Sequence, residues 1–128
     1  MLLQIEERRI PPDITLIGLV GKLTLGRESQ RVETLVEEMS GSWRLKAIFD
    51  MTRVDYLDST GIGLLAVAAE KLKAAGGILV VVAGEGRVLQ LLKMTRVALI
   101  FPVYTTMEEA EGAFAETQPP AAALLHDM

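Results

Sequence analysis

The segment best suited to chemistry is Asp58-Ser59-Thr60-Gly61, where polar residues directly precede an apolar run. Aspartate, serine and threonine often begin a helix, because their side-chain oxygens accept the free backbone N–H groups of its first turn. Those N–H groups and the positive end of the helix dipole also accommodate an anion. A phosphate on Ser59 would add about 1.5 to 2 negative charges there, beside the like charge of Asp58. The segment therefore predicts either a simple helix cap or a phosphorylation switch.

The helix expected to follow this segment has an outer face with few charges. Its inner face, which should meet a sheet, is apolar at helical spacing: Ile62, Leu65, Ala69 and Leu72. Its outer face holds Gly63, Val67, Glu70, Lys71 and Ala74, with Leu64 at the border. A weakly apolar strip beside a capping serine indicates a docking surface. Scattered exposed alanines and valines are also ordinary, so this alternative stays open.

Composition excludes most other chemistries. The 128 residues include no cysteine and one histidine, His126, so disulfides, thiolate nucleophiles and histidine-rich metal sites lack their side chains. The net charge is -4 and no dense basic stripe is present, which argues against direct nucleic-acid binding. We expect no enzymatic activity and no cofactor.

The hydropathy pattern also bears on location. No apolar run approaches the roughly 20 residues that span a bilayer. The first nine residues lack the basic start and apolar stretch of a signal peptide. We therefore expect a cytoplasmic protein without membrane insertion.

The elements that must position Ser59 follow from the apolar pattern. Five strands are predicted, over residues 2–10, 14–20, 45–50, 78–83 and 99–104. Pro11-Pro12-Asp13 should join the first two, an edge strand and its neighbour, as a hairpin. The fourth is apolar throughout and bounded by glycines, which is typical of a central parallel strand covered on both faces.

Four helices are predicted, over residues 26–39, 59–75, 87–95 and about 107–114. We expect residues 21–24 to form a loop in which Thr24 caps the first helix, and a polar turn and loop to run from Asp50 into the second. Val88, Leu91 and Leu92 should face inward in the third helix. Thr105 or Thr106 should cap the fourth.

Strands that alternate with helices after an opening hairpin imply an α/β fold. The sheet should be mixed and mostly parallel, with about five strands and about four helices. We expect one domain over residues 1–116, because a chain of this length suits a single domain. Residues 117–128 show no periodicity and are expected to form a flexible tail.

The segment from Asp50 to Gly63 resembles the signature of the STAS domain, named for sulfate transporters and anti-sigma factor antagonists. The matching pattern is Asp50-x-Thr52-x-Val54-x-Tyr56-x-Asp58-Ser59-Thr60-Gly61-Ile62-Gly63. Supporting matches are Gly21-Lys22-Leu23-Thr24, Lys71-x-Lys73-Ala74-Ala75-Gly76-Gly77 and residues 88–95. The resemblance spans about Leu2 to Phe114 and implies a STAS-like fold.

The resemblance also implies a partner-switching role. An unphosphorylated antagonist would bind an anti-sigma factor with serine kinase activity and so free the sigma factor. Phosphorylation of the serine after the motif aspartate, here Ser59, would break that contact, and a serine phosphatase would restore it. Thr60 is a candidate minor site. The candidate partner-binding residues are Thr24, Asp58, Ser59, Thr60, Gly61, Gly63, Leu64, Val67 and Lys71.

Two positions depart from the family pattern. Many STAS members carry an acidic residue where this chain has Thr24, near the candidate phosphorylation site. Many relatives have glycine where this chain has Arg96, after the third predicted helix.

Other functions remain as alternatives. The chain could be a non-switching STAS scaffold or a regulatory module of a larger signalling or transport assembly. Gly84-Glu85-Gly86 lacks the further glycine and the Lys-Ser/Thr pair of a phosphate-binding loop, so it indicates a plain turn. A phosphoaspartate receiver would need clustered carboxylates at the end of the first strand and a lysine near the last. The first strands supply only Glu6, Glu7 and Asp13, and residues 99–104 contain no lysine.

Overall fold

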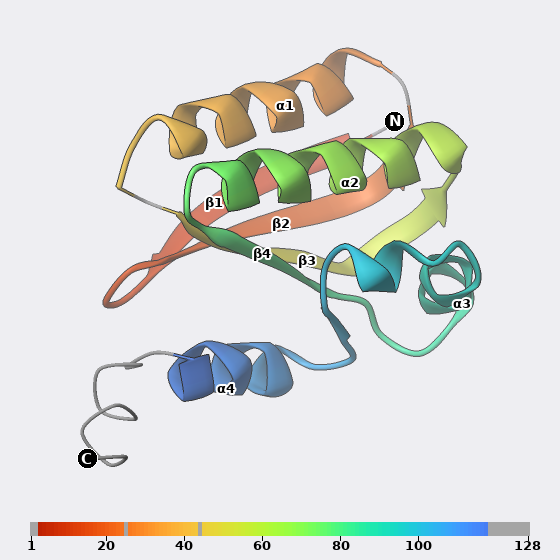
Figure 1. Ribbon diagram of the computed structural model, residues 1–128. Helices are drawn as coiled ribbons and strands as arrows, with labels where there is room; N and C mark the ends of the chain where they lie inside the picture. Colours follow the sequence, from red (N-terminus) through yellow and green to blue (C-terminus); the bar gives the residue numbers. More distant parts are fainter. Residues whose placement is uncertain (1–2, 25, 44, 118–128) are drawn as a thin grey trace.

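The computed structural model describes residues 3–24, 26–43 and 45–117 (Figure 1). The elements are β1 (Leu3–Ile10), β2 (Ile14–Leu23), α1 (Arg27–Ser40), β3 (Lys46–Leu57), α2 (Ser59–Ala74), β4 (Ile78–Val82), α3 (Arg87–Met94), the 3-10 turn η1 (Val97–Leu99), β5 (Val103–Tyr104) and α4 (Met107–Thr117). This order confirms the predicted alternation of strands and helices. The predicted tail lies almost wholly in residues 118–128, outside the described residues.

One mixed sheet carries the fold. Its five strands lie in the order β1-β2-β3-β4-β5, with β1 antiparallel to β2 and the remaining neighbours parallel. The opening hairpin and the edge position of β1 are therefore confirmed. The α/β class with a mostly parallel sheet is also confirmed.

Helices cover both faces of this sheet. Helices α1, α2 and α3 contribute to a large apolar cluster on one face, built around Phe49, Leu65 and Leu72. Helix α4 covers the other face, where Phe114 meets Ile48 and other strand residues (Figure 1). Strand β4 supplies alternate residues to the two clusters, which confirms a central strand buried on both faces.

Strands β2 and β3 are longer than predicted. Gly21 pairs with Val54 and Leu23 pairs with Leu57, so the expected loop over residues 21–24 and the expected turn at Asp50 are both wrong. Strand β4 pairs with β3 only as far as Asp50. The two strands therefore continue beyond β4 as a half-exposed extension, where polar residues such as Asp55 are tolerated. Because polar residues are also typical of loops, the sequence pattern predicted a loop in this region.

The predicted N-terminal cap is wrong for α1 and confirmed for α4. Gly26, not Thr24, is the N-cap of α1: its carbonyl accepts a hydrogen bond from Ser29 Oγ (2.7 Å), and its N–H donates to the same oxygen (3.0 Å). Thr106 caps α4 as expected, since its Oγ1 accepts the N–H of Glu109 (3.1 Å). The backbone N–H of Thr105 donates a hydrogen bond to the Glu109 carboxylate. This hydrogen bond is the main reason that the pKa of Glu109 lies below its ordinary value.

The region after α2 also differs from prediction. The expected strand over residues 99–104 shortens to Val103–Tyr104, because residues 97–99 form the turn η1. In α3, Leu92 is buried and Val88 and Leu91 are half-buried against the core, which confirms the predicted inward face; Leu89, which was not predicted, is also buried.

We expect Leu65→Ala to lower the free energy of unfolding by about 2–5 kcal/mol, because it removes a large side chain that is fully buried between α2 and the sheet. Urea denaturation followed by circular dichroism measures the change. Val67→Ala, on the exposed side of the same helix, is the matched control and should shift stability by no more than about 0.5 kcal/mol. Equal effects of the two substitutions would contradict the observed helix orientation.

Candidate functional site

The candidate site begins at the first turn of α2. Asp58 is the N-cap residue: its backbone is extended, and its Oδ1 accepts the N–H of Gly61 at 2.9 Å. Ser59 is thus the first residue inside the helix, and the expectation that Ser59 itself caps the helix is wrong. Ser59 and Thr60 are both exposed. Two hydroxyls therefore lie at the positive end of a helix dipole, where an anion is favoured.

Gly61 sets how closely this turn approaches the sheet. A Cβ atom at Gly61 would lie 2.2 Å from the Leu23 carbonyl oxygen and 2.8 Å from the Leu57 side chain. Only glycine therefore allows the first turn of α2 to rest on the ends of β2 and β3. Gly61 is buried, so it positions the neighbouring hydroxyls and is a poor candidate for the direct partner contact predicted from the sequence.

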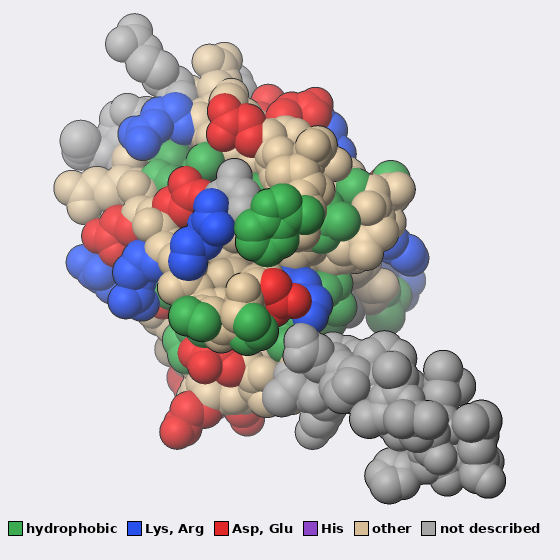
Figure 2. Space-filling model, turned by 90° about the vertical axis from the view of Figure 1, so that its left-hand side faces the viewer, with side chains coloured by type: hydrophobic (Ala, Val, Ile, Leu, Met, Phe, Trp, Pro, Cys, Tyr) green, Lys and Arg blue, Asp and Glu red, His purple; other side chains and the backbone are tan. Residues whose placement is uncertain are grey.

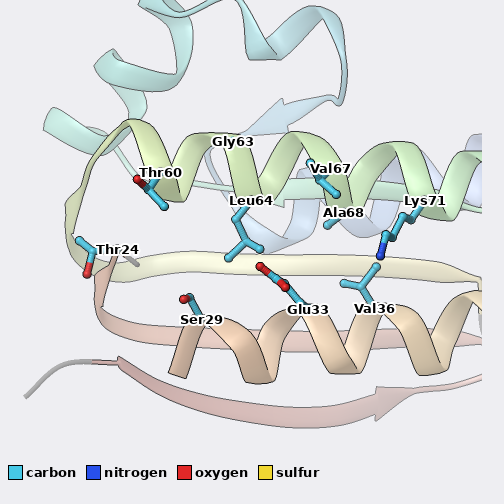
Figure 3. A pocket seen from close by; sticks show the side chains of 10 residues that line it. All are labelled: Thr24, Ser29, Glu33, Val36, Thr60, Gly63, Leu64, Val67, Ala68 and Lys71. Atoms are coloured by element: carbon cyan, nitrogen blue, oxygen red, sulfur yellow. The ribbon is translucent and has the colours of Figure 1, made fainter. Parts of the chain in front are cut away.

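A groove runs between α1 and α2, beside Ser59. It has a volume of about 230 Å³. Its lining includes six of the predicted partner-binding residues: Thr24, Thr60, Gly63, Leu64, Val67 and Lys71 (Figure 3). Asp58 and Ser59 do not line the groove. They precede Thr60 directly in the chain, at the end of the groove where Figure 3 shows Thr60 and Thr24.

The groove has an apolar floor and a charged rim. Val36, Leu64 and Ala68 are buried at its base. Lys71 Nζ lies 2.7 Å from Glu37 Oε2 and links α2 to α1 at the far end. Val67 is 53% exposed, so an aliphatic surface is accessible from solvent beside these buried residues. Such a groove suits a protein partner that presents an apolar side chain.

Sequence reasoning missed the wall formed by α1. Ser29, Glu33 and Val36 line the groove from that helix. They are spaced by four and three residues, which places them along one side of a helix. This spacing could have identified them, but the sequence does not state that this side of α1 meets α2.

The described residues offer little for other chemistry. Within residues 3–24, 26–43 and 45–117, no group of three or more His, Cys, Asp or Glu side chains could hold a metal ion. Gly84-Glu85-Gly86 connects β4 to α3, as expected of a plain turn. No helix in the described part of the chain has the length and apolar character needed to cross a bilayer.

Comparison with known proteins identifies the family. The sequence-family model of the STAS domain matches residues 7–110 of this chain. The chain therefore belongs to the STAS domain family.

Particular relatives are similar to the chain over most of its length. A putative anti-sigma factor antagonist of Bordetella bronchiseptica, BtrV, is 23% identical over 84% of this chain and 92% of its own length. An anti-sigma factor antagonist of Mycobacterium paratuberculosis has a similar crystal structure, with a TM-score of 0.76, 21% identity and coverage of 87% of this chain and 92% of its own.

A third protein of similar fold is SpoIIAA, solved in two states. The structure of its unphosphorylated form has a TM-score of 0.69 and 15% identity, and covers 89% of this chain and 99% of its own. The structure of the phosphorylated form, described as a Bacillus cell fate determinant, has a TM-score of 0.64 and 16% identity, and covers 86% and 98%. At these identities the structural likeness concerns the fold.

We expect Gly61→Ala and Gly63→Ala to have opposite effects on stability. An added methyl at Gly61 would meet backbone and core atoms, which should cost about 1–3 kcal/mol. A methyl at Gly63 would meet nothing within 4 Å and should stabilise the helix by about 0.5–1 kcal/mol. Thermal and urea unfolding of the two variants measures the difference. A Gly61→Ala protein as stable as the wild type would refute the close approach.

Proposed function

We propose that this chain is an anti-sigma factor antagonist whose binding to an anti-sigma factor is switched by phosphorylation of Ser59. The observation that carries the proposal is the position of Ser59, exposed at the start of α2 and next to the groove between α1 and α2. The family membership and the names of the relatives support the same class of function.

In the unphosphorylated state, the partner surface consists of the exposed start of α2 and the adjoining groove. An apolar side chain of the anti-sigma factor would enter above Leu64 and Val67, which supplies hydrophobic contact area. The hydroxyls of Ser59 and Thr60 and the rim residues Thr24 and Lys71 would supply polar contacts around it. In this state the partner contacts a surface in which Ser59 is uncharged.

Phosphorylation changes the charge of this surface while the fold persists. The first turn of α2 carries free backbone N–H groups and the positive end of a dipole, so the helix tolerates a phosphate at its first residue. Asp58 lies directly before it, and Glu33 lies on the opposite wall of the groove. The phosphate would therefore concentrate negative charge at the rim, and burying that charge against a partner would be costly.

The partners follow from this cycle. A serine kinase, most simply the anti-sigma factor itself, adds the phosphate to Ser59, with Thr60 as a minor site. A serine phosphatase removes it and restores binding. In this cycle the chain acts in the cytoplasm as a binding partner and a phosphorylation substrate, it needs no cofactor, and its effect on transcription is indirect.

The test compares Ser59→Asp and Ser59→Ala in binding to an anti-sigma factor with serine kinase activity from the same organism. We expect Ser59→Asp to weaken the affinity at least about tenfold, because it places a charge in the contact surface. Ser59→Ala should bind nearly as well as the wild type but accept no phosphate at this position. Isothermal titration calorimetry measures the affinities, and circular dichroism checks that both variants are folded.

Equal affinities of Ser59→Asp and wild type would contradict the switch. A stable assembly that forms regardless of the residue at position 59 would instead support the alternative of a non-switching scaffold or regulatory module.

A further inference from the structure

A second exposed surface lies on the other side of α2 from the groove. It consists of Lys73, Lys93, Met94, Arg96, Leu99 and Ile100, which we call the basic apolar corner. Its apolar members are unusually exposed: Met94 is 77% exposed, Leu99 is 84% and Ile100 is 43%. Large aliphatic side chains that protrude together mark an interaction site more often than scattered ones do.

The corner has one sign of charge. From Val88 to Met107 the sequence contains two cationic residues, Lys93 and Arg96, and no acidic one, although the whole chain has a net charge of -4. Lys73 adds a further cation from α2, where it lines a hollow together with Ile100. The acidic residue nearest to the corner along α2 is Glu70, three residues before Lys73. By contrast, Figure 2 shows acidic and basic side chains interspersed over the end of the molecule at the left of Figure 1.

The backbone at Arg96 supplies an independent observation. Its φ of 64° lies in the left-handed region, and it is the one residue other than glycine with positive φ in the described part of the chain. It follows the C-cap of α3, Thr95, at a position where glycine normally avoids strain. Arg96 is exposed, so this backbone position places a guanidinium at the surface of the corner.

We propose that the basic apolar corner binds peripherally to an anionic lipid surface. The cations would lie among the lipid head groups, and Leu99 and Met94 would enter the boundary between head groups and acyl chains. These side chains project outward from a helix end and a short turn, so they can penetrate a fluid surface without a matching pocket. Corner-to-corner pairing of two copies would bring like charges together, whereas an anionic lipid surface places opposite charge against the cations.

Such binding would leave the groove free. Helix α2 lies between α1 and η1 (Figure 1), with the groove residues Leu64 and Lys71 on one side and Lys73 on the other. Membrane attachment would therefore concentrate the protein at a surface without blocking Ser59. The inference does not depend on the proposed phosphorylation switch.

The test is cosedimentation of the full chain with vesicles. We expect binding to vesicles of mixed phosphatidylglycerol and phosphatidylcholine, and none to phosphatidylcholine alone. Because salt screens such contacts over roughly 10 Å at 0.1 M, binding should fall steeply as salt is raised. Failure to bind anionic vesicles at low salt would overturn the proposal.

Three variants localise the site. Arg96→Gly removes one charge and also relieves the left-handed strain, so it should melt at a higher temperature yet bind about fivefold more weakly. Lys93→Glu should weaken binding by more than that, and Leu99→Ser should weaken it several-fold.

Matched controls lie elsewhere on the surface. Lys22→Glu changes an exposed cation outside the corner, and Val67→Ser changes an exposed aliphatic residue in the groove. Each control variant should bind the anionic vesicles more tightly than the corresponding variant in the corner. Equal losses in controls and corner variants would overturn the site. Self-association that Leu99→Ser abolishes, with no binding to vesicles, would assign the corner to a second copy instead.

Discussion

The close approach of α2 to the sheet at Gly61 is the constraint on which the rest of the site depends. Because the Cβ atom is missing there, the first turn of the helix rests directly on the Leu23 carbonyl and the Leu57 side chain. This contact fixes the height of the helix start above the strand ends. At this height Ser59 is exposed, and α2 lies alongside α1 with a groove between them. A larger residue at position 61 would push the first turn of α2 away from the ends of β2 and β3.

The same geometry separates the roles of neighbouring residues. Asp58 satisfies a backbone N–H of the first turn, so the helix begins without help from the Ser59 hydroxyl. Ser59 is then available for modification without loss of a cap. The proposed switch therefore changes surface charge and leaves the interactions that stabilise the fold in place. Stability depends on the buried contacts of Gly61, whereas the proposed regulation depends on the exposed hydroxyl of Ser59. A change in one therefore need not alter the other.

Most of the fold could be predicted from local patterns, and the errors share a physical cause. The apolar run at residues 78–83 and a threonine cap at Thr105 or Thr106 depend on their immediate neighbours, and the structure confirms a strand there and a cap at Thr106. The extensions of β2 and β3 were missed, because beyond Gly21 and Asp50 the two strands pair mainly with each other and carry polar residues. Similarly, the α2 residues of the groove other than Ala68 were identified, whereas Glu33 on α1 was not, since only the tertiary fold brings the two helices together.

The most direct test of the central claim is a phosphopeptide map of the protein from its native cells. Trypsin should release the peptide Val54–Lys71, in which only Tyr56, Ser59 and Thr60 carry hydroxyl groups, so the phosphate can be assigned without ambiguity. If Ser59 is the switch, phosphate should lie chiefly on Ser59, in a fraction that changes with growth conditions. A protein that carries no phosphate in this peptide under any condition would contradict the switch and leave only the fold and the groove.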